Sequence, residues 1–199
     1  MARKTGSHSE ITGPRIKQAA LELFARHGFA AVTMRQIAAN VGVQAGAIYN
    51  YTSDKQALLF DLLDGHMVDL LSKWSAELVP EDPIAALDHF VAFHLDFHIK
   101  RPELVFISYM ELRNLTAVNY KAIVEKRRVY EKIIYNLILS GVVAGDFRVP
   151  DPKITSLALI ALLTGPVDWF REDGRLNSDE LTSKYCALTR QALGVSAQA

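Results

Sequence analysis

The segment at residues 33–58, TMRQIAANVGVQAGAIYNYTSDKQAL, constrains the fold of this chain more than any other part of the sequence. Thr33 is followed three residues later by Gln36, which forms a capping box, so a helix is predicted to begin there. Gly42 can adopt the left-handed conformation that ends a helix, and it predicts a tight turn. The inner face of this short helix is predicted to consist of Ile37, Ala38 and Val41.

A second short helix is predicted at residues 44–51. Ala45, Gly46 and Ala47 are small enough to let the backbone approach the floor of a groove, while Ile48 faces the core. Two short helices joined by a glycine turn, with a third helix directly after them, are the layout of a helix-turn-helix that reads DNA.

The third helix is predicted to run from Lys55 to about Leu78, because Ser53 and Gln56 repeat the capping-box pattern. Lys55 lies in its first turn, where the helix dipole mildly disfavours a cation. A phosphate in front of the helix would remove this conflict, so Lys55 is a candidate phosphate contact.

The charge distribution agrees with this interpretation. The chain has 199 residues and a net charge of zero, which alone would argue against nucleic acid. Between Met1 and Lys55, however, seven basic and three acidic residues give +4, which leaves −4 for the remainder. A positive surface on the helix-turn-helix half is what binding to phosphates requires, although chance clustering of solvated charges is the alternative.

The pattern T-x-x-x-I-A-x-x-x-G-V-x-x-G-x-x-Y-x-Y-x-x-D-K-x-x-L resembles the DNA-binding signature of the TetR/AcrR family of bacterial transcriptional regulators. The resemblance covers the first four predicted helices. The sequence departs from it at Val41, Gln44 and Thr52, where the family usually has alanine, a capping serine and an aromatic residue.

The resemblance implies that Tyr49 and Lys55 contact phosphates, which carry no sequence information. Asn50 is the candidate for base readout, because an asparagine side chain can pair bidentately with adenine. The predicted DNA-binding residues are Thr33, Gln44, Ala45, Ala47, Tyr49, Asn50, Tyr51 and Lys55.

The whole chain is predicted to be all-α, because no alternating strand pattern occurs. An N-terminal three-helix helix-turn-helix domain at residues 1–54, whose first helix runs from Pro14 to residue 27, precedes a helical-bundle domain for ligand binding and dimerisation at residues 55–199. Residues 1–10 are predicted to be a disordered arm, in which Arg3 and Lys4 could follow a minor groove. The later helices are predicted near residues 84–100, 102–115, 117–144, 153–170 and 178–193.

Large apolar and aromatic side chains recur along the bundle helices, where such residues are core by default. The alternative is that some of them line an effector cavity, in which a few polar groups such as His94 and Arg113 would orient the ligand. The predicted ligand-binding residues are Phe93, His94, Phe97, Phe106, Tyr109, Met110, Arg113 and Trp169.

Three segments, SYMELRNL, EKRRVYEKII and VDWFREDGRLNSDEL, are similar to the C-terminal half of TetR regulators that sense acyl-CoA thioesters. This looser resemblance implies an acyl chain in the aromatic cavity and an anionic CoA portion near arginines such as Arg113 or Arg171. Arg127 and Arg128 also fit the solvated face of a long helix.

A homodimer is predicted, because one helix-turn-helix reads few base pairs and two copies could bind a palindromic operator. The last two predicted helices carry more apolar residues than a bundle edge should expose, so they are the predicted interface. The predicted function is a ligand-responsive repressor in the cytoplasm, and the alternative is a constitutive or architectural DNA-binding protein without an effector.

An enzyme is not expected, since the sequence has no nucleophile elbow, glycine-rich phosphate loop or paired-carboxylate pattern, and no cofactor is predicted. His94 and His98 are spaced to share a metal ion, but without an H-E-x-x-H motif the signal is weak, so no metal site is predicted. Cys186 is the only cysteine and is predicted to be a packing residue. The longest apolar run, at residues 157–167, is too short to cross a membrane.

Overall fold

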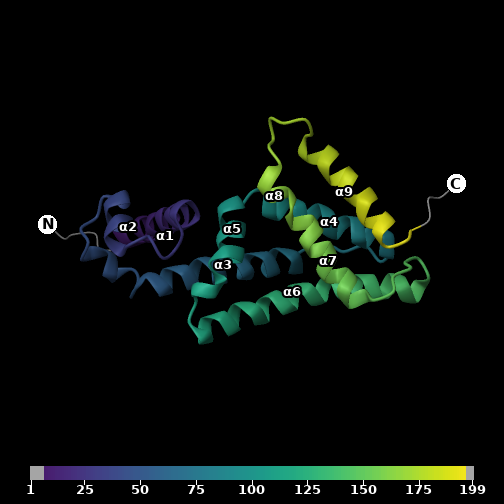
Figure 1. Ribbon diagram of the computed structural model, residues 1–199, viewed down its shortest axis with the longest axis horizontal. Coiled ribbons are helices and arrows are strands. Elements are labelled where there is room, and N and C mark those ends of the chain that lie inside the picture. Colours follow the sequence, from purple (N-terminus) through teal and green to yellow (C-terminus); the bar gives the residue numbers. More distant parts are fainter. Residues whose placement is uncertain (1–6, 196–199) are drawn as a thin grey trace. The chain divides into compact units, whose positions relative to one another are not determined.

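The computed structural model describes residues 7–195, and every regular element in this range is helical (Figure 1). The prediction of an all-α fold is confirmed. The chain divides into two compact units. The first unit comprises the residues up to Val68 together with Glu103–Val124, and the second comprises Asp69–Pro102 together with the residues from Glu125 onward. The predicted functional boundary between residues 54 and 55 stays a prediction.

In the first unit, α1 (Ser7–His27) begins earlier than the predicted start at Pro14. The prediction took Pro14 for a residue of the first turn, where proline is favoured, but here it lies inside the helix. An interior proline removes one hydrogen bond and crowds the carbonyl group four residues earlier, and α1 continues through this position despite that cost. Ser7–Glu10 are therefore helical rather than a disordered arm, and Arg3 and Lys4 lie outside the described residues.

The prediction for α2 (Met34–Val41) is confirmed at both of its ends. The Thr33 hydroxyl accepts a hydrogen bond from the Gln36 amide (3.2 Å), and the Gln36 side chain accepts one from the Thr33 amide (2.8 Å). Gly42 ends the helix with a φ of 78°, a conformation that favours glycine. The buried residues of α2 are those predicted for its inner face: Ile37, Ala38 and Val41.

The predicted helix at residues 44–51 is instead a short 3₁₀ helix, η1 (Ala47–Asn50). Its N-cap is Gly46, which offers no side chain to bond the first free amides. The prediction that Ile48 faces the core is confirmed, since this side chain is fully buried.

The next helix, α3 (Lys55–Ser75), begins at the predicted residue but has a different cap. Asp54, rather than Ser53, accepts the hydrogen bond from the Ala57 amide (2.8 Å). The Gln56 side chain does not complete a capping box and donates instead to the carbonyl oxygen of Asn114. The helix also ends before Leu78.

The first unit also contains α5 (Pro102–Met110), the 3₁₀ helix η2 (Leu112–Asn114) and the start of α6 (Ala117–Ala144). Glu111, a buried residue between α5 and η2, accepts hydrogen bonds from the Phe29 amide (3.1 Å) and from the Asn114 side chain. The turn after α1 is thus attached to a segment far away in the sequence. The predicted single helix at residues 102–115 was wrong, because α5 ends at Met110 and η2 follows separately.

In the second unit, α4 (Pro83–Ile99) packs against α7 (Pro152–Thr164), α8 (Pro166–Trp169) and α9 (Ser178–Ala192), as Figure 1 shows. The predicted single helix at residues 153–170 is divided into α7 and α8, where Gly165 precedes Pro166. The buried apolar residues of this unit include Phe90, Val91, Leu95, Tyr130, Ile134, Ile138, Leu159, Leu163 and Leu181.

Within residues 7–195, none of the helices combines the length and the apolar character needed to cross a bilayer.

Candidate DNA-binding surface and ligand site

Most of the predicted DNA-binding residues are exposed on the first unit. Gln44 and Ala45 precede η1, Tyr49 and Asn50 belong to it, and Tyr51 follows it; all five are exposed. Thr33 is exposed as the N-cap of α2, whereas Ala47 and Lys55 are half-buried. Since buried Ile48 anchors the middle of η1, the neighbouring polar side chains are held at the surface.

Lys55 is engaged inside the first unit. Its Nζ donates to the carbonyl oxygens of Phe29 (2.7 Å) and Val32 (2.7 Å) and lies 4.3 Å from the centre of the Phe29 ring. These carbonyl groups offset the unfavourable position of a cation at a helix N-terminus, the role that the sequence suggested for a phosphate. Lys55 therefore holds the turn between α1 and α2, and its contact with DNA stays a prediction.

Two further basic residues of this half have internal partners. Arg15 donates to the carbonyl oxygen of Val41 (3.0 Å) and so ties α1 to the end of α2. Lys17 forms an exposed ion pair with Asp61 (2.9 Å). Arg35, on α2, is exposed. The net charge of the segment therefore overstates the positive charge that a phosphate backbone would meet.

The predicted ligand-binding residues are divided between the two units. Phe93, His94 and Phe97 lie on α4 in the second unit, and the last two are buried. Phe106, Tyr109 and Met110 on α5 and Arg113 in η2 lie in the first unit. Trp169 belongs to α8 of the second unit. The exposed members of the set are Phe106, Tyr109, Met110, Arg113 and Trp169.

His94 lies at the centre of a buried polar cluster that the sequence did not predict. Its Nε2 is 3.2 Å from the Thr164 hydroxyl, which itself donates to the Ile160 carbonyl oxygen, so Nε2 carries the proton and donates to Thr164. Its Nδ1 is then the acceptor for the Tyr130 hydroxyl (3.1 Å). Both ring nitrogens are thereby bonded within the protein. The only signal in the sequence was that His94 stands among apolar residues of a predicted helix, where a polar side chain needs a hydrogen-bond partner.

His98 stacks on His94, with 4.0 Å between ring centres, and its Nδ1 donates to the His94 carbonyl oxygen (2.8 Å). Burial lowers the pKa of His98 to about 4, and the positive charge of Arg101 acts in the same direction. Burial, with a smaller effect of His98, also holds the pKa of His94 well below its usual value. Both imidazoles are therefore neutral at physiological pH.

Among the described residues, no three His, Cys, Asp or Glu side chains gather as a metal site. Cys186 is half-buried on α9, and its Sγ lies 3.9 Å from the Asp88 carbonyl oxygen. Burial and the neighbouring Asp88 raise the pKa of this thiol to about 11, which leaves little of the reactive thiolate.

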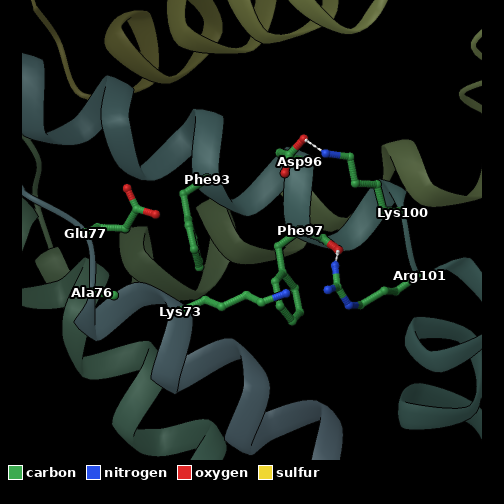
Figure 2. A pocket seen from close by; sticks show the side chains of 8 residues that line it. All are labelled: Lys73, Ala76, Glu77, Phe93, Asp96, Phe97, Lys100 and Arg101. Atoms are coloured by element: carbon green, nitrogen blue, oxygen red, sulfur yellow. Dashed lines mark hydrogen bonds and ion pairs between the residues drawn. The ribbon is translucent and has the colours of Figure 1, made fainter.

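A partly open pocket of about 340 Å³ lies in the second unit, next to the C-terminal end of α3 and one face of α4 (Figure 2). Phe93 and Phe97 project from α4 into this region, and the side chains of Lys73 and Arg101 extend toward the Phe97 ring. The lining residues are Lys73, Ala76, Glu77, Phe93, Asp96, Phe97, Lys100 and Arg101.

Comparisons with known proteins identify the family. Residues 16–62 match the family model of bacterial regulatory proteins of the tetR family, and residues 80–193 match that of the tetracyclin repressor-like C-terminal domain. The chain is 25% identical to the HTH-type transcriptional repressor KstR2 of Rhodococcus jostii over 194 residues, which cover 96% of this chain and 92% of the relative.

Solved structures agree with these matches. A tetR-family regulatory protein from Rhodococcus RHA1 superposes with a TM-score of 0.86 at 26% identity, covering 94% of this chain and 98% of that one. AibR, solved in complex with isovaleryl coenzyme A and operator DNA, has the same fold, with a TM-score of 0.79 at 19% identity over 89% of this chain and 97% of its own. The chain belongs to the TetR family of bacterial transcriptional regulators, and it is a DNA-binding regulator rather than an enzyme.

Proposed function

We propose that this protein is a repressor that binds a palindromic operator as a homodimer and releases it when a small hydrophobic or acyl-CoA-type effector binds. The observation that carries this proposal is the exposed η1 segment: Tyr49 and Asn50 project from a short helix anchored by Ile48 directly after a well-capped α2. This arrangement suits insertion into a major groove. A bacterial regulator that binds operator DNA acts where that DNA is, so we infer a cytoplasmic location.

Exposed apolar side chains on the last helices support the dimer. Ile154 is 65% exposed, and Leu157 and Leu162 on the same helix are also exposed, as is Leu188 on α9. Apolar residues that gather on one or two helices of a small bundle are typical of an interface. Two copies of this surface would pack as a four-helix arrangement about a twofold axis.

Binding to DNA should depend on Asn50 and Tyr49 in different ways. We expect Asn50→Ala to reduce discrimination between operators by about 1–3 kcal/mol, because it removes a bidentate base contact. Tyr49→Ala should weaken binding to all duplexes alike, since a phosphate contact carries no sequence information. Selection from randomised duplexes, followed by gel shifts at fixed salt, measures both effects.

The matched control is Asn136→Ala, which removes an exposed asparagine on α6 in the second unit. It should leave the selected consensus and the affinity unchanged. An unchanged consensus for Asn50→Ala would contradict its assignment to base readout.

The effector proposal rests on the ligand of AibR and on the looser acyl-CoA resemblance. It implies that the charge of the effector matters as much as its shape. An acyl-CoA thioester should release operator DNA at far lower concentration than its free acid, because only the thioester carries phosphates for arginines to bind. Arg113→Ala should raise the thioester concentration needed for release without changing operator affinity in its absence. Gel shifts with a panel of thioesters and matching acids test this, with exposed Arg148→Ala as control.

Equal potency of acid and thioester would instead indicate a sensor of ordinary hydrophobic ligands. If no compound released DNA or raised the melting temperature, the protein would be a constitutive DNA-binding protein, because a ligand at 100 times its Kd should add about 2.7 kcal/mol of stability.

A further inference from the structure

The pocket next to α3 and α4 has an aromatic floor (Figure 2). Phe93 is half-buried, and its ring lies 6.0 Å from the Phe97 ring at an angle of 22° between their planes. The Phe93 ring also makes an edge-to-face contact with Trp74, with 5.1 Å between the ring centres. Because Phe97 is only 3% exposed, the accessible apolar surface of this pocket of about 340 Å³ is mainly the Phe93 ring, and the volume suits one substituted ring.

The Phe97 end of this pocket carries an excess of positive charge. Lys73 and Arg101 both pair with one carboxylate oxygen, Oδ2 of Asp69, at 3.3 Å and 3.2 Å. Lys73 also lies 5.6 Å from the centre of the Phe97 ring. Two cations that share a single carboxylate leave one positive charge without a matching negative charge beside the aromatic floor.

The remaining charged residues of the pocket make its two ends electrostatically different. Lys100 is paired with its own carboxylate, Asp96, four residues earlier on the chain. Glu77 lies toward the opposite, Phe93 end of the pocket, where its Oε2 is 3.0 Å from Nε2 of His89. An anionic group is therefore attracted to the Phe97 end and repelled from the Phe93 end.

Arg101 is held in position before any ligand arrives. Its guanidinium donates to the Phe97 carbonyl oxygen (2.8 Å) and to Asp69, and its central carbon lies 4.0 Å from the centre of the Phe97 ring. These two hydrogen bonds use two of its five N–H donors. The side chain of Lys73 is 50% exposed, and its surface ion pair is weak, so its ammonium can turn to a better anion at little cost.

We propose that this pocket binds a planar aromatic or heteroaromatic group that carries an acidic substituent, such as a phosphate or a carboxylate. The ring packs on Phe93, and the acid bonds to Lys73 and Arg101 at the Phe97 end of the pocket. This site lies within the second unit and does not involve Arg113, and it rests on the proposed function only for the effect of the ligand on DNA.

Phenyl phosphate is the probe that tests this site, with inorganic phosphate and benzyl alcohol as probes for the acid alone and the ring alone. Calorimetric titration of the full chain should show saturable binding of phenyl phosphate and much weaker binding of the other two. In nuclear magnetic resonance spectra of nitrogen-labelled protein, the indole N–H signal of Trp74 should shift. The signal of Trp169, which does not line the pocket, serves as the internal control.

Lys73→Gln and Arg101→Gln should each raise the Kd of phenyl phosphate about tenfold, because each removes a charge-assisted hydrogen bond. Lys184→Gln, the same change at an exposed residue of α9, should leave it unchanged. If Arg101→Gln lowers the melting temperature, its effect on binding could come from lost stability. The Lys73→Gln variant then tests the site, because the Lys73 side chain is half-exposed.

The proposal is overturned if phenyl phosphate does not saturate, if either partial probe binds as tightly, or if Lys184→Gln weakens binding as much as Lys73→Gln. Gel shifts with operator DNA are measured separately. A protein that binds phenyl phosphate but no DNA would contradict the proposed function and leave the site intact.

Discussion

Lowering the pH from about 7 to about 5 is expected to remove about 2 kcal/mol of unfolding free energy through His98 alone. Burial lowers the pKa of His98 to about 4 in the folded protein, whereas an imidazole in the unfolded chain titrates near 6.5. Above the unfolded value, neither state is protonated and the stability is fully present. As the pH falls, only the unfolded state gains a proton until the pH approaches 4, so stability is lost across this window. His94, whose pKa is also lowered by burial, acts in the same direction.

Urea unfolding at a series of pH values measures this effect. His98→Asn keeps an N–H donor near the position of Nδ1 for the His94 carbonyl oxygen but has no titrating ring. The stability of this variant should fall by about 2 kcal/mol less than that of the wild type over the same pH interval. A comparison at about pH 8, where both imidazoles are neutral in both states, separates the loss of packing from the loss of titration. Identical pH slopes would show that folding does not lower the pKa of His98.

Glu111→Ala should lower the unfolding free energy by about 2–3 kcal/mol. The substitution leaves the buried Phe29 amide without an acceptor and removes the partner of the Asn114 side chain. Because the Phe29 turn leads into the capped start of α2, we also expect weaker operator binding at temperatures close to the melting point. Calorimetric melting should record a decrease of several degrees, about 2–4 °C for each kcal/mol in a chain of this size.

Two variants distinguish this hydrogen-bonding role from a general effect of removing a charge. Glu22→Ala deletes a carboxylate from the exposed face of α1, and its effect should stay within about 0.5 kcal/mol. Glu111→Gln keeps an oxygen for the Phe29 amide and should restore most of the stability, provided that the Asn114 amide flips to present its oxygen. If Glu111→Ala were as mild as Glu22→Ala, the buried hydrogen bond would contribute nothing.

The sequence predicted those parts of the fold that depend on neighbouring residues. The Thr33 and Gln36 box and the Gly42 turn involve contacts three or four residues apart, so a local pattern was sufficient. Ser53 and Asp54 are both good N-cap residues at adjacent positions, and the pattern could not decide between them. One helix was predicted across Gly165 and Pro166, but the structure has two helices there. Whether a proline kinks a helix or ends it depends on how the surrounding bundle packs.

Contacts between distant segments could not be predicted from one sequence. The bond from Phe29 to Glu111 spans 82 residues, and no periodicity relates the two positions. The partners of His94 on α6 and α7 were invisible for the same reason. Periodicity also finds an apolar helix face without revealing what covers it, so Phe106 and Tyr109 were grouped with Phe97 although only Phe97 is buried.

The attachment of Glu111 to the turn after α1 bears on how hybrid repressors are built from this protein. A fusion of residues 1–68 to the sensor half of another family member would separate the Phe29 amide from Glu111 and the Gln56 side chain from the Asn114 carbonyl oxygen. A graft that also carries Glu103–Val124 brings both partners along. The compact unit that contains the helix-turn-helix is therefore discontinuous in sequence, and a crossover point chosen from the motif alone would cut through it.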